Sequence, residues 1–238
     1  MCTERGSPAP CARADRDDRR MVGWAPLADE IAAFVLSGSC AGCDASGTLL
    51  CGGCRGALSA RPVRTTTPGG VPVVAALEFD GVPARVIRRL KEEGETLLAR
   101  PLGAAVRQSA ADVVAQHPRA MIVPVPTGRA SHRRRGFRVP DLLMRCAGLR
   151  PCRMLVPARR VEDQRGLDPQ QRRRNVAGSM RARHARAAHE VLLFDDVVTT
   201  GATLDEGARA LTAAGFRVRG AIALAATPRR RELPANAS

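Results

Sequence analysis

Residues 191–203, with the sequence VLLFDDVVTTGAT, constrain the fold of this chain more than any other segment. They join a short apolar run to two adjacent carboxylates and then to a Thr-Thr-Gly turn. The apolar run 191–194 is typical of a parallel strand that is covered on both faces. Asp195 and Asp196 follow at the carboxyl end of this strand, where open α/β sheets bind their ligands. The segment therefore predicts an α/β fold with a binding site at this strand end.

The turn after the carboxylates combines small side chains, hydroxyl groups and successive backbone N–H groups. It consists of Thr199, Thr200, Gly201, Ala202 and Thr203. Apolar residues recur behind it at helical spacing (Leu204, Ala208, Leu211), so the turn leads into a helix. Backbone donors and the helix dipole favour an anion there, most naturally a phosphate. The alternative is a strand, a turn and a capped helix without a ligand, which leaves the two carboxylates without a purpose.

From Val71 onward, strand-like segments alternate with helical segments, and this order indicates a parallel sheet covered by helices. The expected strands are residues 73–79, 121–125, 155–156, 179–183, 191–194 and 217–225. The expected helices are residues 86–98, 102–115, a segment around 142–144, and 204–214. Residues 159–175 are polar and highly charged, and so long a loop in a compact domain is usually functional or mobile.

The composition limits the class of protein. The chain has 238 residues and a formal net charge of +15, which attracts polyanions and phosphorylated substrates. We expect a disordered tail over 1–20, a helix and a cysteine module over 21–68, the α/β domain over 69–227 and a disordered tail over 228–238. No apolar run is as long as a membrane span, and residues 1–20 carry Arg and Asp instead of an apolar signal segment. These features predict a cytoplasmic protein.

A cluster of cysteines precedes the α/β domain. Cys40, Cys43, Cys51 and Cys54 follow the pattern C-x₂-C-x₇-C-x₂-C, with glycines that permit tight turns. Four thiolates suit a structural Zn²⁺ with no open coordination position for catalysis. A pair of disulfides is the alternative, and a reducing cytoplasm disfavours it. The pattern therefore predicts a zinc site.

Residues 191–203 resemble the PRPP-binding fingerprint of the type I phosphoribosyltransferases, in which apolar residues run into DD, two apolar residues and TTGxT. The resemblance implies that Asp195 and Asp196 hold the ribose hydroxyls of PRPP and that the turn wraps its 5′-phosphate. The PRPP-binding set that it implies in this segment is Asp195, Asp196, Val197, Val198, Thr199, Thr200, Gly201, Ala202 and Thr203.

The order of motifs along the chain is similar to that of the ComF competence-protein family. The paired CxxC is followed by IVPVP, RRRGF, a Q-x₆-Q-R-x₂-N-V stretch at 164–176 and DDVVTTGATL. The resemblance implies a type I phosphoribosyltransferase fold with a zinc motif, and PRPP bound with Mg²⁺. It implies a pyrophosphate-side loop at Pro126, Thr127, Gly128 and Arg129, and a lid at 159–175 whose Arg165 and Arg172 neutralise pyrophosphate. A solvated basic loop is the alternative reading of that lid. Arg138 and Val139 stand where the family has Asn-Gln, which puts that part of the site in doubt.

The resemblance leaves two functions open. One is an enzyme that transfers or cleaves the phosphoribosyl group of PRPP. The other is a single-stranded-DNA-binding competence factor for which PRPP is a regulatory ligand, with contacts from the basic segments 129–138, 172–174 and 181–186. Phe137 is the only aromatic residue in those segments, so they support only sequence-neutral contact with phosphates. A homodimer is expected by analogy alone.

Overall fold

The computed structural model describes residues 38–126, 136–159, 175–183 and 189–228. The helices and turns are α2 (Gly52–Ala57), α3 (Gly81–Arg88), the π-helical turn η1 (Arg89–Glu93), the 3-10 turn η2 (Thr96–Leu98), α4 (Ala99–Gln116), α6 (Val139–Cys146) and α8 (Ala202–Ala213). The strands are β1 (Val63–Thr66), β2 (Pro72–Glu78), β3 (Met121–Pro124), β4 (Leu155–Pro157), β5 (Met180–Ala182), β6 (Glu190–Val198) and β7 (Arg217–Ala226). In this part of the chain, no helix is both long and apolar enough to cross a membrane. The predicted tail 1–20 and all but Pro228 of the predicted tail 228–238 lie outside the described residues.

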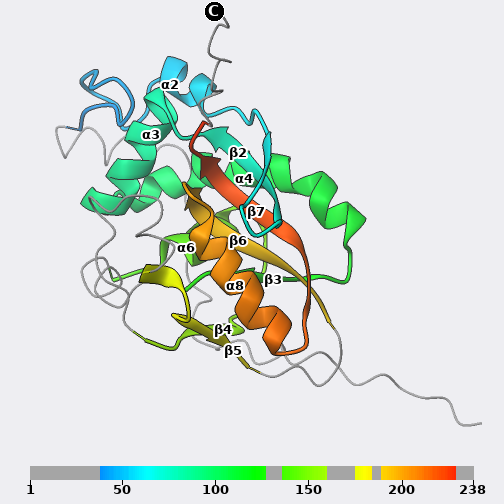
Figure 1. The fold of residues 1–238 in the computed structure, drawn as a ribbon. Helices are drawn as coiled ribbons and strands as arrows, with labels where there is room; N and C mark the ends of the chain where they lie inside the picture. The colour runs from blue at the N-terminus through cyan, green and yellow to red at the C-terminus, as the bar shows by residue number, and fades with distance from the viewer. Residues whose placement is uncertain (1–37, 127–135, 160–174, 184–188, 229–238) are drawn as a thin grey trace, which may run out of the picture.

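A five-stranded sheet with the order β1-β2-β7-β6-β3 forms the centre of the fold (Figure 1). The strands β2, β7, β6 and β3 are parallel, and β1 joins the edge antiparallel to β2. The predicted α/β class with a mostly parallel sheet is therefore confirmed. The centres of β6 and β7 are continuous buried apolar runs, as expected for parallel strands that are covered on both faces.

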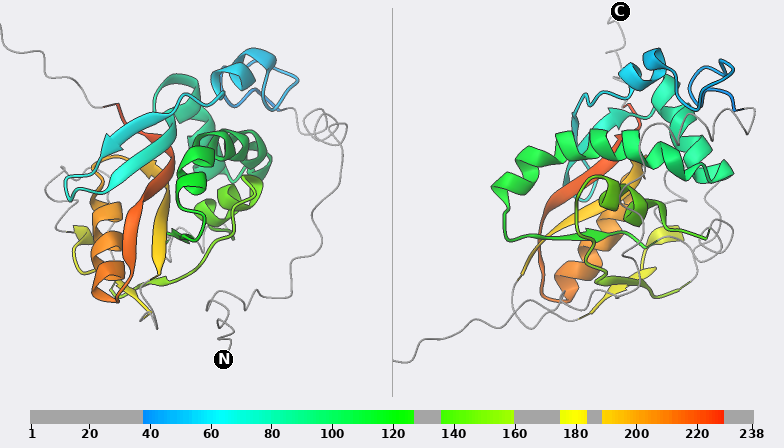
Figure 2. Two further views of the ribbon diagram at one scale, coloured as in Figure 1. Left: turned by 90° about the vertical axis from the view of Figure 1, so that its right-hand side faces the viewer. Right: turned by 180° about the vertical axis from the view of Figure 1, so that it is seen from behind.

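Helices cover both faces of this sheet (Figure 2). On one face α8 packs against β6 and β7, and on the other α4 packs against β2 and β7 beside α6. The alternation of β6 serves both layers, because successive side chains of a strand point to opposite faces. Val191 and Leu193 enter the core with α8, whereas Leu192 and Phe194 enter the core with α4.

Several predicted elements differ in extent or pairing. The helix predicted over 86–98 differs in extent: α3 begins earlier, at Gly81, and continues into η1, which ends at Glu93. Gly94 is the C-cap of η1, and its φ of 77° lies in the left-handed region that commonly ends helices. β4 and β5 pair with each other rather than with the central sheet. β1 was not predicted, because its sequence VRTT is polar and suits only a half-exposed edge strand.

The cysteine segment packs against the same core as α4. Cys40 and Leu58 are buried in one cluster with Ile87 and Leu102. Close approach of the chain is needed here, since a Cβ on Gly42 would lie 2.6 Å from the Sγ atom of Cys54. The segment that contains α2 lies beside α3, at the end of the sheet to which the arrowhead of β7 points (Figure 1).

Candidate functional site

The acidic pair lies where the connections of the sheet change direction. β3 and β6 are parallel neighbours, yet the chain leaves β3 for α6 on one face and leaves β6 for α8 on the other. Such a switch point opens a crevice outside the carboxyl ends of the two strands. Asp195 and Asp196 stand near the carboxyl end of β6, within the strand rather than after it, because β6 continues to Val198.

Short hydrogen bonds fix the two carboxylates. The backbone N–H of Asp196 donates to Oδ1 of Asp195 at 2.8 Å, and the N–H of Val197 donates to Oδ1 of Asp196 at 2.8 Å. The second oxygen of Asp196 forms an ion pair with Lys91 of η1, with Nζ 3.0 Å from Oδ2. Asp195 is buried, whereas the Asp196 side chain is 16% exposed. Asp195 is therefore shielded from solvent, whereas Asp196 is partly accessible to it.

The environments of the two carboxylates push their pKa values apart. Burial, followed by the adjacent charge of Asp196, raises the pKa of Asp195 well above its usual range. Burial acts in the same direction on Asp196, but the charge and hydrogen bond of Lys91 outweigh it, so the pKa of Asp196 is lowered. Of the two carboxyl groups, Asp196 is therefore the more readily ionised.

The turn 199–203 leads from β6 directly into α8. Gly201 adopts a φ of 79° at the N-cap of α8, and the N–H of Ala202 donates to the hydroxyl of Thr200 at 3.4 Å. Among the described residues, nothing accepts a hydrogen bond from the backbone N–H groups of Thr199, Thr200 and Gly201. Thr199 is exposed, and Thr203 is half-buried in the first turn of α8. Donors at a helix N-terminus suit an anion.

A hairpin from the sheet edge holds this turn in place. The hydroxyl of Thr67 donates to Oδ1 of Asp205 in the first turn of α8, and the N–H of Gly69 donates to Oδ2 at 3.0 Å. A Cβ on Gly69 would lie 2.6 Å from Oδ1 of Asp205, and one on Gly201 would lie 2.9 Å from Cβ of Thr67. The two glycines thus allow the β1–β2 hairpin to lie directly against the turn.

The loop predicted to bind pyrophosphate is described only at its start. The N–H of Val125 donates to the carbonyl of Phe194 at 2.9 Å, so the chain leaves β3 beside Asp195. Pro126 is half-buried there. The rest of the predicted set, Thr127, Gly128, Arg129, Arg165 and Arg172, lies outside the described residues.

The side chain of Arg159, at the start of the predicted lid, bonds to the backbone at the other end of that segment. One guanidinium nitrogen of Arg159 donates to the carbonyl oxygens of Asn175 at 2.8 Å and Ala177 at 2.7 Å. The described residues that flank segment 160–174 are therefore held together.

Sequence reasoning missed Lys91, Thr67 and Asp205. Lys91 carries one available signal, since it is the only lysine in the sequence. Thr67 and Asp205 carry none, because their contact spans 138 positions of the chain.

The four cysteines come together as predicted. Their Sγ atoms all lie within 4.8 Å of one another, and those of Cys43 and Cys51 are 3.7 Å apart. Tetrahedral Zn²⁺ with Zn–S bonds of about 2.3 Å places its sulfur ligands about 3.8 Å apart, so the cluster fits this ion. Burial raises the pKa of Cys40, but hydrogen bonds from the backbone N–H groups of Cys51, Gly42 and Cys43 outweigh it and lower the pKa to about 6. Burial and the neighbouring thiols raise the pKa of Cys54 to about 12.

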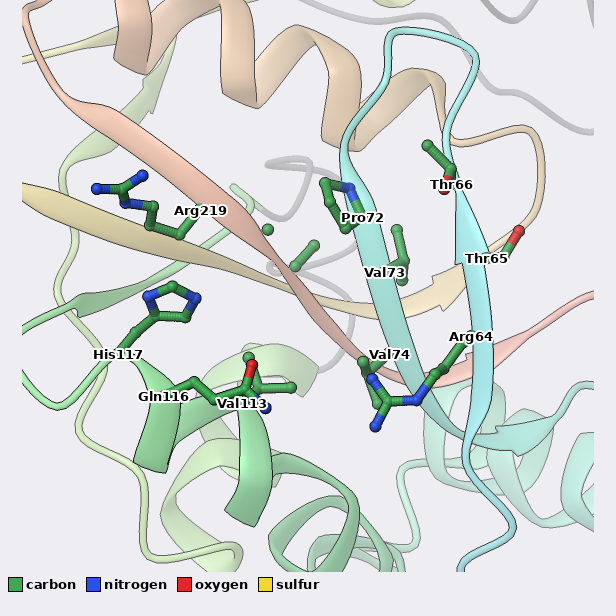
Figure 3. A pocket seen from close by; sticks show the side chains of 12 residues that line it. Arg64, Thr65, Thr66, Pro72, Val73, Val74, Val113, Gln116, His117 and Arg219 are labelled. Carbon is green, nitrogen blue, oxygen red and sulfur yellow. The ribbon is translucent and has the colours of Figure 1, made fainter.

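A groove of about 350 Å³ lies at the opposite, amino edge of the sheet (Figure 3). Pro72 of β2, Gly220 of β7 and His117 after α4 line it. Arg219 also lines it and is paired with Glu190, its Nε donating to Oε1 at 2.9 Å. The acidic pair and this groove are therefore at opposite ends of the parallel strands.

Fold and site together define an α/β protein with an acidic pair and an anion-suited turn at the switch point of a mostly parallel sheet. Among solved structures, the chain is similar to an orotate phosphoribosyltransferase from Aeropyrum pernix, with 18% identity and a TM-score of 0.32. That alignment covers 71% of this chain and 75% of the other. No family model matches the sequence, and no curated protein matches it.

Proposed function

We propose that this chain is a phosphoribosyltransferase-fold protein of the ComF type that binds PRPP with Mg²⁺ at the carboxyl end of β6. The observation that carries the proposal is the uninterrupted path from the acidic pair through the turn 199–203 into α8. In this proposal, Asp195 and Asp196 bind the ribose hydroxyls, and the backbone N–H groups of the turn bind the 5′-phosphate. The position of the pair at the switch point supports it, because that is where open α/β sheets bind ligands.

The proposed reaction breaks the bond between ribose C1 and pyrophosphate. The protein would mainly stabilise the charge that develops on the leaving group and on the ribose ring. Pro126, Thr127, Gly128 and Arg129 would line the pyrophosphate side, and the exit of β3 beside Asp195 supports this assignment. Arg165 and Arg172 would approach from segment 160–174, whose ends Arg159 holds together. Mg²⁺ would neutralise pyrophosphate through ligand oxygens and water, with the acidic pair close by.

The cysteine cluster is proposed to bind a structural Zn²⁺ through Cys40, Cys43, Cys51 and Cys54. The spacing of the thiols supports this assignment. Four cysteine ligands leave no position for a substrate, so the ion would stabilise the fold and take no part in catalysis.

A second function is a cytoplasmic single-stranded-DNA-binding factor that PRPP regulates. The net charge of +15 favours it, as does the order of the chain, because the basic segment 129–138 follows β3, which ends beside the acidic pair. DNA affinity would then fall steeply with salt and depend weakly on base sequence. A PRPP-dependent change in DNA affinity without pyrophosphate release would favour this factor over the enzyme. A homodimer remains an expectation by analogy.

The deciding experiment is a calorimetric titration of PRPP and Mg²⁺ into the zinc-loaded protein, with the double variant Asp195→Asn/Asp196→Asn alongside. We expect saturable binding by the wild type and none by the variant. Pyrophosphate release in the presence of candidate acceptor bases then tests turnover. A folded wild-type protein that does not bind PRPP would remove the proposal.

A further inference from the structure

One contact joins the acidic pair to a segment more than a hundred positions earlier in the chain. Lys91 lies in η1, and its ammonium is 3.0 Å from Oδ2 of Asp196. Its side chain is 28% exposed, so Lys91 is partly accessible to solvent. Because Lys91 is the only lysine in the sequence, no other lysine can take over this contact.

The backbone that carries Lys91 is firmly held. Arg89, two positions earlier, donates to the carbonyl of Ser39 at 3.1 Å and forms ion pairs with Glu93 at 3.0 Å and Glu95 at 2.7 Å. The next residue, Leu90, is fully buried. A π-helical turn of this kind inside a helical segment is frequent at functional sites. The neighbours of Lys91 in η1 are therefore anchored by hydrogen bonds, ion pairs and burial.

Lys91 contacts the oxygen of Asp196 that a ligand hydroxyl would also contact. Oδ1 of Asp196 already accepts the N–H of Val197, and Oδ2 accepts Lys91. A sugar hydroxyl that binds Oδ2 of Asp196 would share this oxygen with the Lys91 ammonium. A phosphorylated sugar also brings anionic oxygens, and these are strong partners for an ammonium group.

We propose that Lys91 positions Asp196 in the free protein through their ion pair. When a sugar hydroxyl binds that carboxylate, the Lys91 side chain turns away and its ammonium pairs with phosphate oxygens of the ligand instead. The exchange keeps a charged partner for Lys91 in both states, so ligand binding leaves no half-buried cation unpaired. This inference rests on the proposed function, because it requires a phosphorylated sugar at the acidic pair.

The single lysine makes the exchange directly observable. Reductive methylation with ¹³C-formaldehyde labels Lys91 and the α-amine, and it keeps the positive charge of lysine. We expect the NMR signal of Lys91 to shift during titration with PRPP and Mg²⁺ and to saturate together with the calorimetric signal. Calorimetric binding with an unmoved Lys91 signal would overturn the exchange and leave the proposed function intact. No calorimetric binding would remove the proposed function, and the exchange with it.

Matched variants test the same step through affinity. Lys91→Met should weaken PRPP binding on the order of tenfold to a hundredfold, since a charge-assisted hydrogen bond is lost. Lys91→Arg should restore most of that loss. Arg85→Met serves as the control, because Arg85 is an exposed residue of α3 and the change in net charge is the same. Circular dichroism establishes that each variant folds, and a folded Lys91→Met variant with wild-type or tighter affinity would overturn the proposal.

Discussion

The cysteine cluster and the acidic pair both gather charged groups, but the chain assembles them differently. The four thiols come from residues 40–54 and meet through short turns. The acidic pair consists of neighbours in sequence, yet its counter-ion comes from Lys91 and its supporting turn is held by Thr67 of a hairpin. The cysteine cluster therefore depends mainly on local turns, whereas the acidic site depends on the packing of distant segments.

The two regions also meet at η1. Arg89 bonds to Ser39 next to the cysteine cluster, and Lys91 bonds to Asp196 of the acidic pair. Perturbing one region while measuring the other therefore tests how independent they are.

The largest effect is expected from Cys40→Ser. Cys40 is fully buried, and the free energy of binding a structural metal is also free energy of folding. Bound zinc should fall to near zero, and the free energy of unfolding should drop by more than about 4 kcal/mol. Metal analysis and urea denaturation measure these changes. Cys146→Ser, in a half-buried cysteine outside the cluster, is the control. A variant that keeps both metal and stability would show that the cluster is no metal site.

Asp196→Asn is expected to have the next largest effect, and it acts on ligand binding. The amide loses its charge and leaves Lys91 without its partner, so PRPP affinity should fall by about a hundredfold. Calorimetry measures this loss. Asp112→Asn, in an exposed carboxylate of α4, should leave the affinity unchanged. Equal losses in the two variants would point to net charge instead of the site.

Asp205→Ala tests the support of the turn. It removes the acceptor of Thr67 and of the Gly69 N–H, and such losses typically cost about 1–3 kcal/mol. We expect that decrease in the free energy of unfolding, together with weaker PRPP binding and unchanged zinc content. Unchanged PRPP affinity in the destabilised variant would show that the hairpin does not order the turn.

Asp195→Asn should have a smaller effect that depends on pH. Because the pKa of Asp195 is raised in the folded state, its contribution to stability is present below its ordinary pKa of 3.8 and is lost as the pH rises through the raised value. The amide imitates the protonated acid, so the variant should gain stability relative to wild type as the pH increases. Urea denaturation from pH 4 to 9 measures this difference, and a difference that is constant with pH would contradict the prediction.

Arg219→Gln should have the smallest effect. Hydrogen bonds from Arg219 are the main cause of the lowered pKa of Glu190, so that pKa should return toward 4.5. NMR titration measures this change. PRPP affinity should stay the same, since Arg219 lies at the opposite edge of the sheet from the acidic pair. An altered affinity would mean that the two edges are coupled.

The sequence by itself determined the features that depend on neighbouring residues. The apolar run of β6 indicated a buried parallel strand, the pattern of cysteines indicated a thiol cluster, and the Thr-Thr-Gly turn indicated the start of α8. Each follows from backbone geometry over a few positions, and a short pattern is enough to reveal it.

Only the tertiary structure decided which distant groups complete these features. In the structure, the helical segment predicted over 86–98 is interrupted at Gly94, and β4 pairs with β5. Packing also places Lys91 beside Asp196 and Thr67 beside Asp205. A single lysine or threonine forms no periodic pattern, so the sequence around it does not predict which distant residue it contacts. The burial of Asp195 and the ion pair of Asp196 set their opposite pKa shifts, and both result from how the layers pack.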